Sequence, residues 1–467
     1  MKKIKKLKYP LYNEGKERRR FMKRFVILLV AVLFLGLTPL FSQCGIAEEL
    51  AIATVNNPDM ITMQKLSEEF TKDTGIKLSF IVLPENELRQ KVTQDVALGA
   101  GKFDIVTIGT YDTPFWAANK WIVSLEPYFK KMSATELKEY NRDDFLSPII
   151  SALSLNGEQF AIPFYGESSM VFYRKDLFEK HGLTMPKAPT WEEIYQFAKV
   201  LNDPANNTYG IVLRGLPGWG QNMAVFGTMI NAFGARWFDE KWHPQFDTQE
   251  MRNAFQFYKK IVTEVGEPGP TTVGFTEALA LMSSGRAGMW YDATVAAGFL
   301  EGADSTVKGK VAYALAPSTK KKNNGWLWAW SLAIESASKN KDAAFKFMTW
   351  ATSKDYIKLV GETLGWQQAP PGTRISTYEN PNYQAAAPFA TLTLDSMKNA
   401  DYDKPTYDPV PYKGVQYVSI PEFQGLGEQV GQELAAYLSG AKDLETVIQA
   451  CQKAALEVSK DGGYYKE

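Results

Sequence analysis

Cysteine and histidine are almost absent from this chain of 467 residues. It has two cysteines, Cys44 and Cys451, and two histidines, His181 and His243, both in turn-like contexts. So few of these residues give neither a disulfide framework nor the spacings that bind zinc. A Gly-x-Ser-x-Gly nucleophile elbow and a phosphate-binding loop are missing too. We therefore expect no catalytic residues, no metal and no cofactor.

An excess of one charge is also missing, since 52 Lys and Arg balance 52 Asp and Glu. The balance hides an uneven distribution, because residues 1–25 hold eleven Lys/Arg and two Glu. An apolar run, FVILLVAVLFLGLTPLF, and small residues follow, which predicts a secretory signal peptide at 1–47. The chain from Glu48 onward has 41 basic and 50 acidic residues, a net charge of about −9. This charge argues against nucleic acid as a partner.

Several details of export stay open. The segment RRRFMK at 18–23 resembles a twin-arginine motif, whereas the strongly apolar run suits the general secretory route. Met22 is an alternative start, and Cys44 is a candidate lipid anchor although FSQC fits the usual pattern poorly. An uncleaved apolar run is nearly long enough to span a bilayer, which leaves a membrane-tethered scaffold as an alternative. Cys451 lies in a helical pattern and is expected to pack in the core.

Strands and helices alternate along the first part of the exported chain. The run 48–60 is β-rich and ends in turn residues, and further strands are predicted at 76–83 and 103–109, with helices over 59–75 and 85–101 between them. This order predicts an α/β fold with a parallel, doubly wound sheet, and the chain length favours two lobes. Ligands of such sheets bind beyond the carboxyl ends of the strands. A further helix is predicted to begin at Thr190, with Glu193 completing its cap.

Five segments carry a resemblance to a known family: FDIVTIGTYDTPFWA, AIPFYGESSMVFYRKDLFEKHG, TWEEIYQFAKVL, SSGRAGMWYDA and SLAIESASKNKDAAFKFMTWATS. Their order over residues 48–467 resembles the maltose-binding-like class, family 1 of the extracellular solute-binding proteins of ATP-driven sugar importers. IATVNNPDMITMQKL, PPGTRISTYENPNY and the run from Gly325 to Glu362 resemble its sorbitol- and mannitol-binding branch.

The resemblance implies a fold and a function. It implies the type II periplasmic-binding fold, in which two discontinuous lobes are joined by crossover hinge strands and close on a ligand in the cleft. The N-terminal lobe would comprise 48–162 and 315–369, and the C-terminal lobe 163–314 and 370–467. Crossovers would fall near Pro163, Pro317 and Pro370–Pro371. The implied protein is a periplasmic or extracellular monomer that delivers a sugar alcohol to the membrane permease subunits of an ABC transporter.

A sugar alcohol needs polar groups for its hydroxyls and flat rings for its C–H surface. On that chemistry and on the resemblance, ten residues are predicted to bind ligand: Asn56, Tyr111, Asp112, Tyr165, Glu167, Trp219, Tyr291, Asp292, Trp328 and Arg374. Turn formation is the alternative for Asn56, helix capping for Asp112, and an interlobe salt bridge for Arg374. Trp290 is expected to pack rather than to bind.

The stretch GWLWAWSLAI places Trp326, Trp328 and Trp330 at alternate positions, which in an extended strand puts all three indoles on one side. By the resemblance, Trp328 would face ligand at the cleft end of a strand and Trp330 would belong to the core. Trp326 would lie beyond them as a lid or interlobe contact.

Two other functions compete with polyol capture. A binding protein of this class for another mono- or oligosaccharide would have the same landmarks. An extracellular carbohydrate-active enzyme needs two carboxylates across the scissile bond, and such a pair is not distinguishable among the many Asp and Glu.

Overall fold

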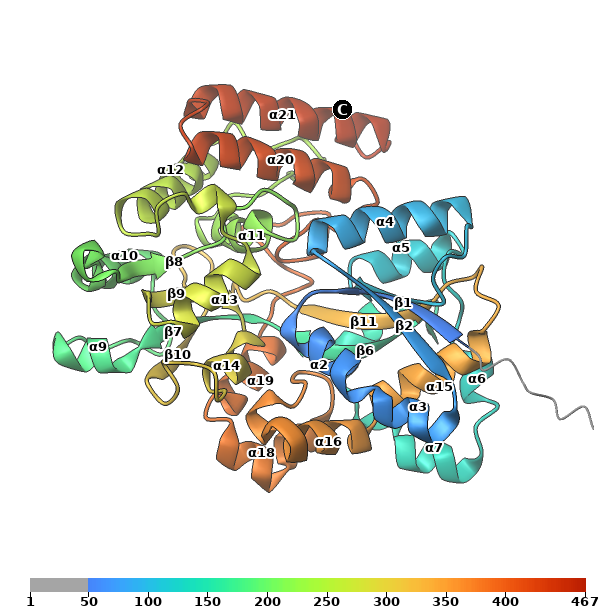
Figure 1. The fold of residues 1–467 in the computed structure, drawn as a ribbon. Helices are drawn as coiled ribbons and strands as arrows, with labels where there is room; N and C mark the ends of the chain where they lie inside the picture. Colours follow the sequence, from blue (N-terminus) through green and yellow to red (C-terminus); the bar gives the residue numbers. More distant parts are fainter. Residues whose placement is uncertain (1–48) are drawn as a thin grey trace, which may run out of the picture. The chain divides into compact units, whose positions relative to one another are not determined.

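The computed structural model describes residues 49–467, which fold around two β-sheets (Figure 1). The predicted signal peptide at 1–47 and Cys44 lie outside the described residues. Within the described part of the chain, no helix is both long enough and apolar enough to cross a membrane. Cys451 is a buried free thiol on a long C-terminal helix, as predicted.

The first sheet has the strand order β2-β1-β3-β11-β6. Its strands are β1 (Glu49–Val55), β2 (Lys77–Leu83), β3 (Ile105–Gly109), β6 (Ala161–Glu167) and β11 (Trp328–Ile334). β1 pairs in parallel with β2 and β3, as the alternation predicts, whereas β11 runs antiparallel to both β3 and β6. β3 and β11 are buried at every position because helices cover both faces of the sheet.

The second sheet has the order β10-β7-β9-β8. Its strands are β7 (Ser169–Arg174), β8 (Tyr209–Val212), β9 (Ala287–Ala293) and β10 (Val311–Leu315). A short hairpin of β4 (Ser154–Leu155) and β5 (Glu158–Gln159) stands apart from both sheets. Ser168 alone separates β6 from β7, so the chain passes directly from one sheet to the other. Residues 316–327 return it from β10 to β11.

Helices cover the two sheets separately. In Figure 1, α4 and α5 lie on one side of the first sheet, and α3 and α15 lie on the other. The helices of this part are α2 (Pro58–Leu66), α3 (Glu68–Thr74), α4 (Glu85–Leu98), α5 (Asp112–Ala118), α6 (Glu126–Phe129), α7 (Ala134–Tyr140), α8 (Ser147–Ala152), α15 (Lys341–Ala351) and α16 (Lys354–Leu364).

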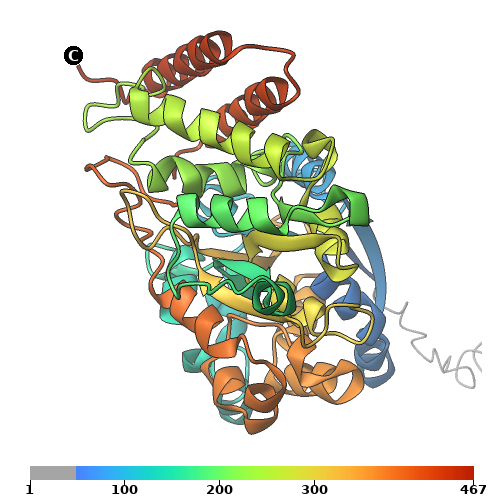
Figure 2. The same cartoon turned by 90° about the vertical axis from the view of Figure 1, so that its left-hand side faces the viewer.

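Around the second sheet, α10, α12 and α13 pack against β8, α9 packs against β7 and β10, and α20 and α21 form an outer layer over α12 (Figure 2). The remaining helices of the described residues are α9 (Lys175–Lys180), α10 (Trp191–Leu201), α11 (Asn222–Ala232), α12 (Gln249–Glu264), α13 (Phe275–Ser283), α14 (Ala296–Leu300), α17 (Ile375–Glu379), α18 (Pro381–Ala386), α19 (Ala390–Lys398), α20 (Phe423–Leu438) and α21 (Leu444–Asp461). Short 3₁₀ turns lie at Arg142–Asp144, Pro204–Asn206, Pro270–Thr272 and Trp366–Gln368.

The predicted cap of α10 is present. The Glu193 backbone N–H donates to Thr190 Oγ1 at 3.2 Å, and the Thr190 N–H donates to the Glu193 carboxylate at 2.8 Å. This capping box satisfies two N–H groups that have no partner inside the helix.

The two-lobed α/β fold is therefore the fold of this chain. Its sheets change over at Ser168 and within 316–327, beside the crossovers expected near Pro163 and Pro317. Whether the lobes divide at the residues given above stays a prediction.

Candidate functional site

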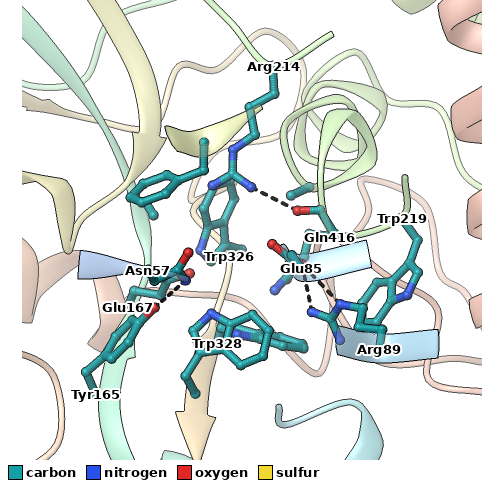
Figure 3. Close-up of a pocket in the computed structure, with 15 residues that line it drawn as sticks. Asn57, Glu85, Arg89, Tyr165, Glu167, Arg214, Trp219, Trp326, Trp328 and Gln416 are labelled. Carbon is teal, nitrogen blue, oxygen red and sulfur yellow. Dashed lines mark hydrogen bonds and ion pairs between the residues drawn. The ribbon is translucent and has the colours of Figure 1, made fainter. Parts of the chain in front are cut away.

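A cavity lies where the two sheets meet (Figure 3). It receives side chains from the ends of β2, β6, β8, β9 and β11 and from several loops. The residues that line it are Asn57, Glu85, Arg89, Tyr165, Glu167, Arg214, Trp219, Gly220, Ala224, Phe275, Ala293, Trp326, Trp328, Trp330 and Gln416. Aromatic rings and groups able to make charged hydrogen bonds therefore face the same space.

All three tryptophans of GWLWAWSLAI line the cavity. Trp328 and Trp330 belong to β11 and their rings meet edge to face with centroids 5.6 Å apart. Trp326 precedes the strand and packs against Tyr291 of the second sheet at 6.2 Å. The expectation that Trp330 is purely a core residue is not supported, since its ring also contributes to the cavity wall.

Trp328 has room only because residue 109 is glycine. A Cβ on Gly109, at the end of β3, would overlap the indole of Trp328. The ring is held from the other side by Trp219 at 5.8 Å and by Tyr417 at 6.1 Å. It is thus a rigid floor to the cavity and 5% exposed.

Arg89 of α4 presents its guanidinium to the cavity from the first sheet's side. Glu85, one helical turn earlier, accepts from Nε at 3.1 Å and from Nη2 at 2.9 Å. Asp112 accepts more weakly from Nη1 at 3.4 Å and also takes the Gly109 N–H at 3.0 Å. The guanidinium lies over the Trp219 ring, 3.9 Å from its centroid, which is a close cation–π contact.

Arg214 presents a second guanidinium from the other sheet's side. Asp292 of β9 accepts two hydrogen bonds from it, from Nε at 2.8 Å and from Nη2 at 2.5 Å. The Gly220 carbonyl accepts a third from Nη1 at 2.9 Å. Burial disfavours the charge, but the Asp292 carboxylate outweighs this and raises the pKa of Arg214. The fork–fork geometry fixes the plane of the guanidinium.

Glu167 ends β6 and is 6% exposed. Burial raises the pKa of this carboxyl well above its usual range, and the nearby Arg214 opposes the shift only in part. Three other polar atoms of described residues that line the same cavity are buried without a hydrogen-bond partner: Trp219 Nε1, Trp326 Nε1 and Gln416 Oε1. The two indole N–H groups are donors and the amide oxygen is an acceptor, so a ligand whose groups both donate and accept would suit them.

Asn57 and Tyr165 complete one end of the cavity. The Asn57 amide donates to the Tyr165 hydroxyl at 2.8 Å, and burial raises the pKa of that phenol. The neighbouring Asn56 is exposed, and its backbone N–H donates to the Leu83 carbonyl at 2.9 Å. The strand end was therefore located correctly, but the adjacent asparagine is the one that faces the cavity.

Four of the ten predicted residues line the cavity: Tyr165, Glu167, Trp219 and Trp328. Tyr111, Asp112, Tyr291 and Asp292 do not line it but lie directly behind residues that do. The Tyr111 ring packs on Trp219 at 5.0 Å, and the Tyr291 hydroxyl bonds Ser169 and Thr228.

Arg374 lies elsewhere. Its guanidinium is fully buried, donates to Asp144 at 3.1 Å and to the Thr352 carbonyl at 2.9 Å, and lines no part of the cavity. The position of Arg374 matches the salt-bridge alternative rather than ligand binding.

The sequence prediction missed Glu85, Arg89, Arg214 and Gln416. Glu85 lies two residues after β2 and Arg214 two residues after β8. Ligands bind beyond the carboxyl ends of strands, so this signal was present in the sequence for both residues. Arg89 and Gln416 come from a helix and from a long loop, and no local pattern marks them. Among the described residues there is no cluster of His, Cys, Asp and Glu arranged to hold a metal ion.

The fold and the cavity define a two-lobed binding protein, and comparison with known proteins gives its family. The model for "Bacterial extracellular solute-binding protein" matches residues 56–358, and the chain belongs to this family. It is 47% identical to a mannitol-binding protein of Pseudomonas aeruginosa over 431 residues, covering 92% of this chain and 96% of that one.

Solved structures agree with this assignment. A solute-binding protein of Agrobacterium vitis S4 with bound D-mannitol is 50% identical, with a TM-score of 0.87 over 90% of this chain and all of that chain. One of Agrobacterium radiobacter K84 in complex with ribitol is 27% identical, with a TM-score of 0.77 over 88% of this chain and 98% of that chain. The family and these relatives are binding proteins rather than enzymes.

Proposed function

We propose that this protein captures a linear sugar alcohol such as mannitol, sorbitol or arabitol in the cavity between its lobes and delivers it, unchanged, to the permease of an ABC importer. The observation that carries the proposal is the charge balance of the cavity. Arg89 is matched by Glu85 and Asp112, and Arg214 by Asp292, so no positive charge is left over for an anionic sugar acid. A neutral ligand with many hydroxyls fits this balance.

The chemistry of the cavity wall supports the same ligand. Each hydroxyl of a polyol donates one bond and accepts others, which suits the unpartnered Trp326 Nε1 and Gln416 Oε1 together with the Glu167 carboxyl. The C–H face of the chain would lie on the Trp328 and Trp330 rings. The relatives named for mannitol, or solved with mannitol and ribitol, support a polyol over an oligosaccharide.

The proposal also covers the state and the processing of the chain. The protein would act as a monomer outside the cytoplasmic membrane, without catalysis and without a cofactor. Cleavage before Glu48 would release the chain, and Cys44 would stay behind with the signal peptide. Intact mass of the exported protein, starting at Glu48, tests this processing, and a lipid-modified Cys44 would contradict it.

Calorimetry on protein freed of co-purified ligand tests the ligand class. Mannitol, sorbitol and arabitol should each bind at one site, far more tightly than maltose or gluconate, and NMR should recover each compound unaltered. Tighter binding of gluconate would overturn the charge-balance argument. Chemical conversion of the bound compound would overturn the assignment as a binding protein.

A further inference from the structure

A surface groove runs alongside the cavity, between α4 of the first lobe and α20 of the second. Five of its eleven lining residues carry amide or hydroxyl side chains: Asn86, Gln90, Thr93, Gln94 and Gln424. Groups of this kind hydrogen-bond the hydroxyls of carbohydrates. The groove therefore has the chemistry of a carbohydrate subsite outside the closed cavity.

A single layer of side chains separates the cavity from the groove. Arg89 and Trp219 are the two residues that line both spaces, and their stacked contact of 3.9 Å forms the partition. Figure 3 shows this pair at one end of the cavity, opposite Asn57 and Tyr165. The two residues belong to different lobes, so the partition exists only when the lobes meet.

Contacts between the lobes hold the partition in place. Glu85, which fixes Arg89, also accepts from Gln221 of the second lobe at 3.0 Å. The Asn86 amide donates across the same boundary to the Pro217 carbonyl at 3.1 Å. The loop GLPGWGQ can approach Glu85 this closely because residue 220 is glycine. A Cβ at this position would overlap the Glu85 carboxylate. The loop is thus seated on the first turn of α4.

We propose that the Arg89–Trp219 partition sets the length of the ligand, and that the groove between α4 and α20 is a second subsite that the partition keeps closed off. The proposal rests on the polyol function above. In the parent protein, a six-carbon alditol fills the cavity and meets the partition at one end. Removal of the indole joins the two spaces, and a glycosyl alditol then places its alditol part in the cavity and its sugar ring in the groove.

The test compares sorbitol with maltitol, which is sorbitol carrying one glucosyl unit, by calorimetry. The parent should bind sorbitol at least about 100-fold more tightly than maltitol. Trp219→Ala should bind maltitol at least about 10-fold more tightly than the parent does, while sorbitol binding weakens or stays the same. Trp219→Leu keeps an apolar side chain against Tyr111 and Phe423, and it should shift the preference in the same direction if the alanine variant folds poorly.

Thr93→Ala is the matched control, because Thr93 lines the groove but not the partition or the cavity. It should leave sorbitol binding unchanged in either background and weaken maltitol binding only when combined with Trp219→Ala. A parent that binds maltitol as well as sorbitol overturns the proposal. So does a Trp219→Ala protein in which both ligands weaken equally.

Failure of the polyol assignment gives a different result. In that case the parent binds neither alditol, and glucose and maltose take the places of sorbitol and maltitol in the same comparison. A partition that limits length still predicts a gain for the longer ligand in Trp219→Ala. No gain with either pair overturns it independently of the ligand class.

Discussion

Glu167 is a buried carboxyl with a raised pKa that lines the cavity beside Asn57 and Tyr165, and its replacement tests the polar part of the site. A carboxylate accepts bonds from two hydroxyls, each worth roughly 1.5–3 kcal/mol because the acceptor is charged. Glu167→Gln keeps the shape but replaces one acceptor with a donor. We expect the Kd of the polyol to rise about 10- to 100-fold, measured by calorimetry.

The pH dependence of binding separates this role from simple packing. Hydroxyls that donate to Glu167 favour its ionised form, so binding lowers its pKa and affinity should rise as pH rises toward the pKa of the free protein. The Glu167→Gln protein should lack this dependence. Glu158→Gln, on the exposed side of β5, is the control and should behave as the parent. Equal affinity in parent and Glu167→Gln would remove the carboxyl from the site.

We expect Asp292 to affect ligand binding through its ion pair with Arg214, although Asp292 itself does not line the cavity. Asp292→Asn retains one acceptor for the guanidinium but loses the charge and one of the two parallel bonds, so Arg214 is no longer held in one plane. Affinity should fall by about 10-fold. The same change at Asp176, which pairs with Arg174 away from the cavity, should have no effect on affinity. Calorimetry of both variants checks the prediction, and equal effects would contradict it.

At this scale, sequence reasoning located the site better than it located the contacts. Strand ends gave Asn56, Tyr111 and Asp112, which lie near the cavity without lining it. Glu167, the last residue of β6, does line it and was predicted from the family resemblance. Whether a polar residue touches the ligand or only braces one that does depends on partners distant in sequence. Asp292 was predicted as a contact, but its partner Arg214 is 78 positions away and was not identifiable from the sequence.

The position of the Trp328 ring at the cavity depends on the pairing of β3 with β11. Gly109→Ala places a methyl group where the Trp328 indole lies, and the backbone of neither strand has freedom to yield. Overpacking of this kind costs about 1–3 kcal/mol, and the displaced ring should also weaken polyol binding. Urea unfolding and calorimetry measure the two effects. Gly425→Ala on α20, where a Cβ meets nothing within 4 Å, should instead be neutral or stabilising.

The same packing changes what is expected of Trp328 itself. From sequence, Trp328→Ala is expected to bind polyols more weakly and to stay folded, because Trp328 is predicted to face ligand and is not assigned to a lobe core. Its contacts with Trp330, Tyr417 and Gly109 show that the ring is also part of the lobe's packing. A large-to-small change at such a buried ring costs stability as well as affinity.

The carboxyl end of β11 carries a pH-dependent element. Glu335 is fully buried, its two oxygens have no hydrogen-bond partner in the described part of the chain, and burial together with the Asp95 and Asp104 carboxylates raises its pKa to about 9. The folded protein therefore keeps a proton that the unfolded chain releases above about pH 4.5. Stability should fall as pH rises from about 4.5 to 9, by at most about 1.4 kcal/mol per pH unit from this group.

Glu335→Gln removes this proton uptake and supplies a permanent amide donor toward Asp95. The variant should match the parent near pH 5 and be increasingly more stable than the parent at pH 7 and pH 9, measured by urea unfolding. A stability difference that does not change with pH would contradict the assigned proton. Binding of the polyol should be unaffected, because Glu335 does not line the cavity.

For the whole molecule, the order of strands and helices predicted an α/β fold, the chain length favoured two lobes, and the family resemblance implied that the lobes are discontinuous. Alternating elements define parallel units such as β1, β2 and β3 from local pattern alone. The placement of β11 between β3 and β6 brings together segments more than 160 residues apart. Local pattern does not encode that pairing, and the resemblance implied only that residues 315–369 share a lobe with residues 48–162.

Closure of the lobes depends on the narrow fit between Gly220 and Glu85. Ligand binding should draw the lobes together and lower the radius of gyration measured by small-angle X-ray scattering. In Gly220→Ala the added methyl group would overlap the Glu85 carboxylate, so loop 215–221 can seat on α4 only if Glu85 swings away and gives up its bonds with Arg89 and Gln221. This variant should keep the larger radius even with saturating polyol, and its Kd should rise by about 10-fold or more, since part of the binding free energy is spent on an imperfect closure.

The free energy of unfolding of Gly220→Ala without ligand should remain close to that of the parent, because the clash exists only in the closed arrangement. A Gly220→Ala protein that compacts fully on binding would show that the loop yields, and closure would then have to be limited by the crossover at Ser168 and the return segment at 316–327 instead.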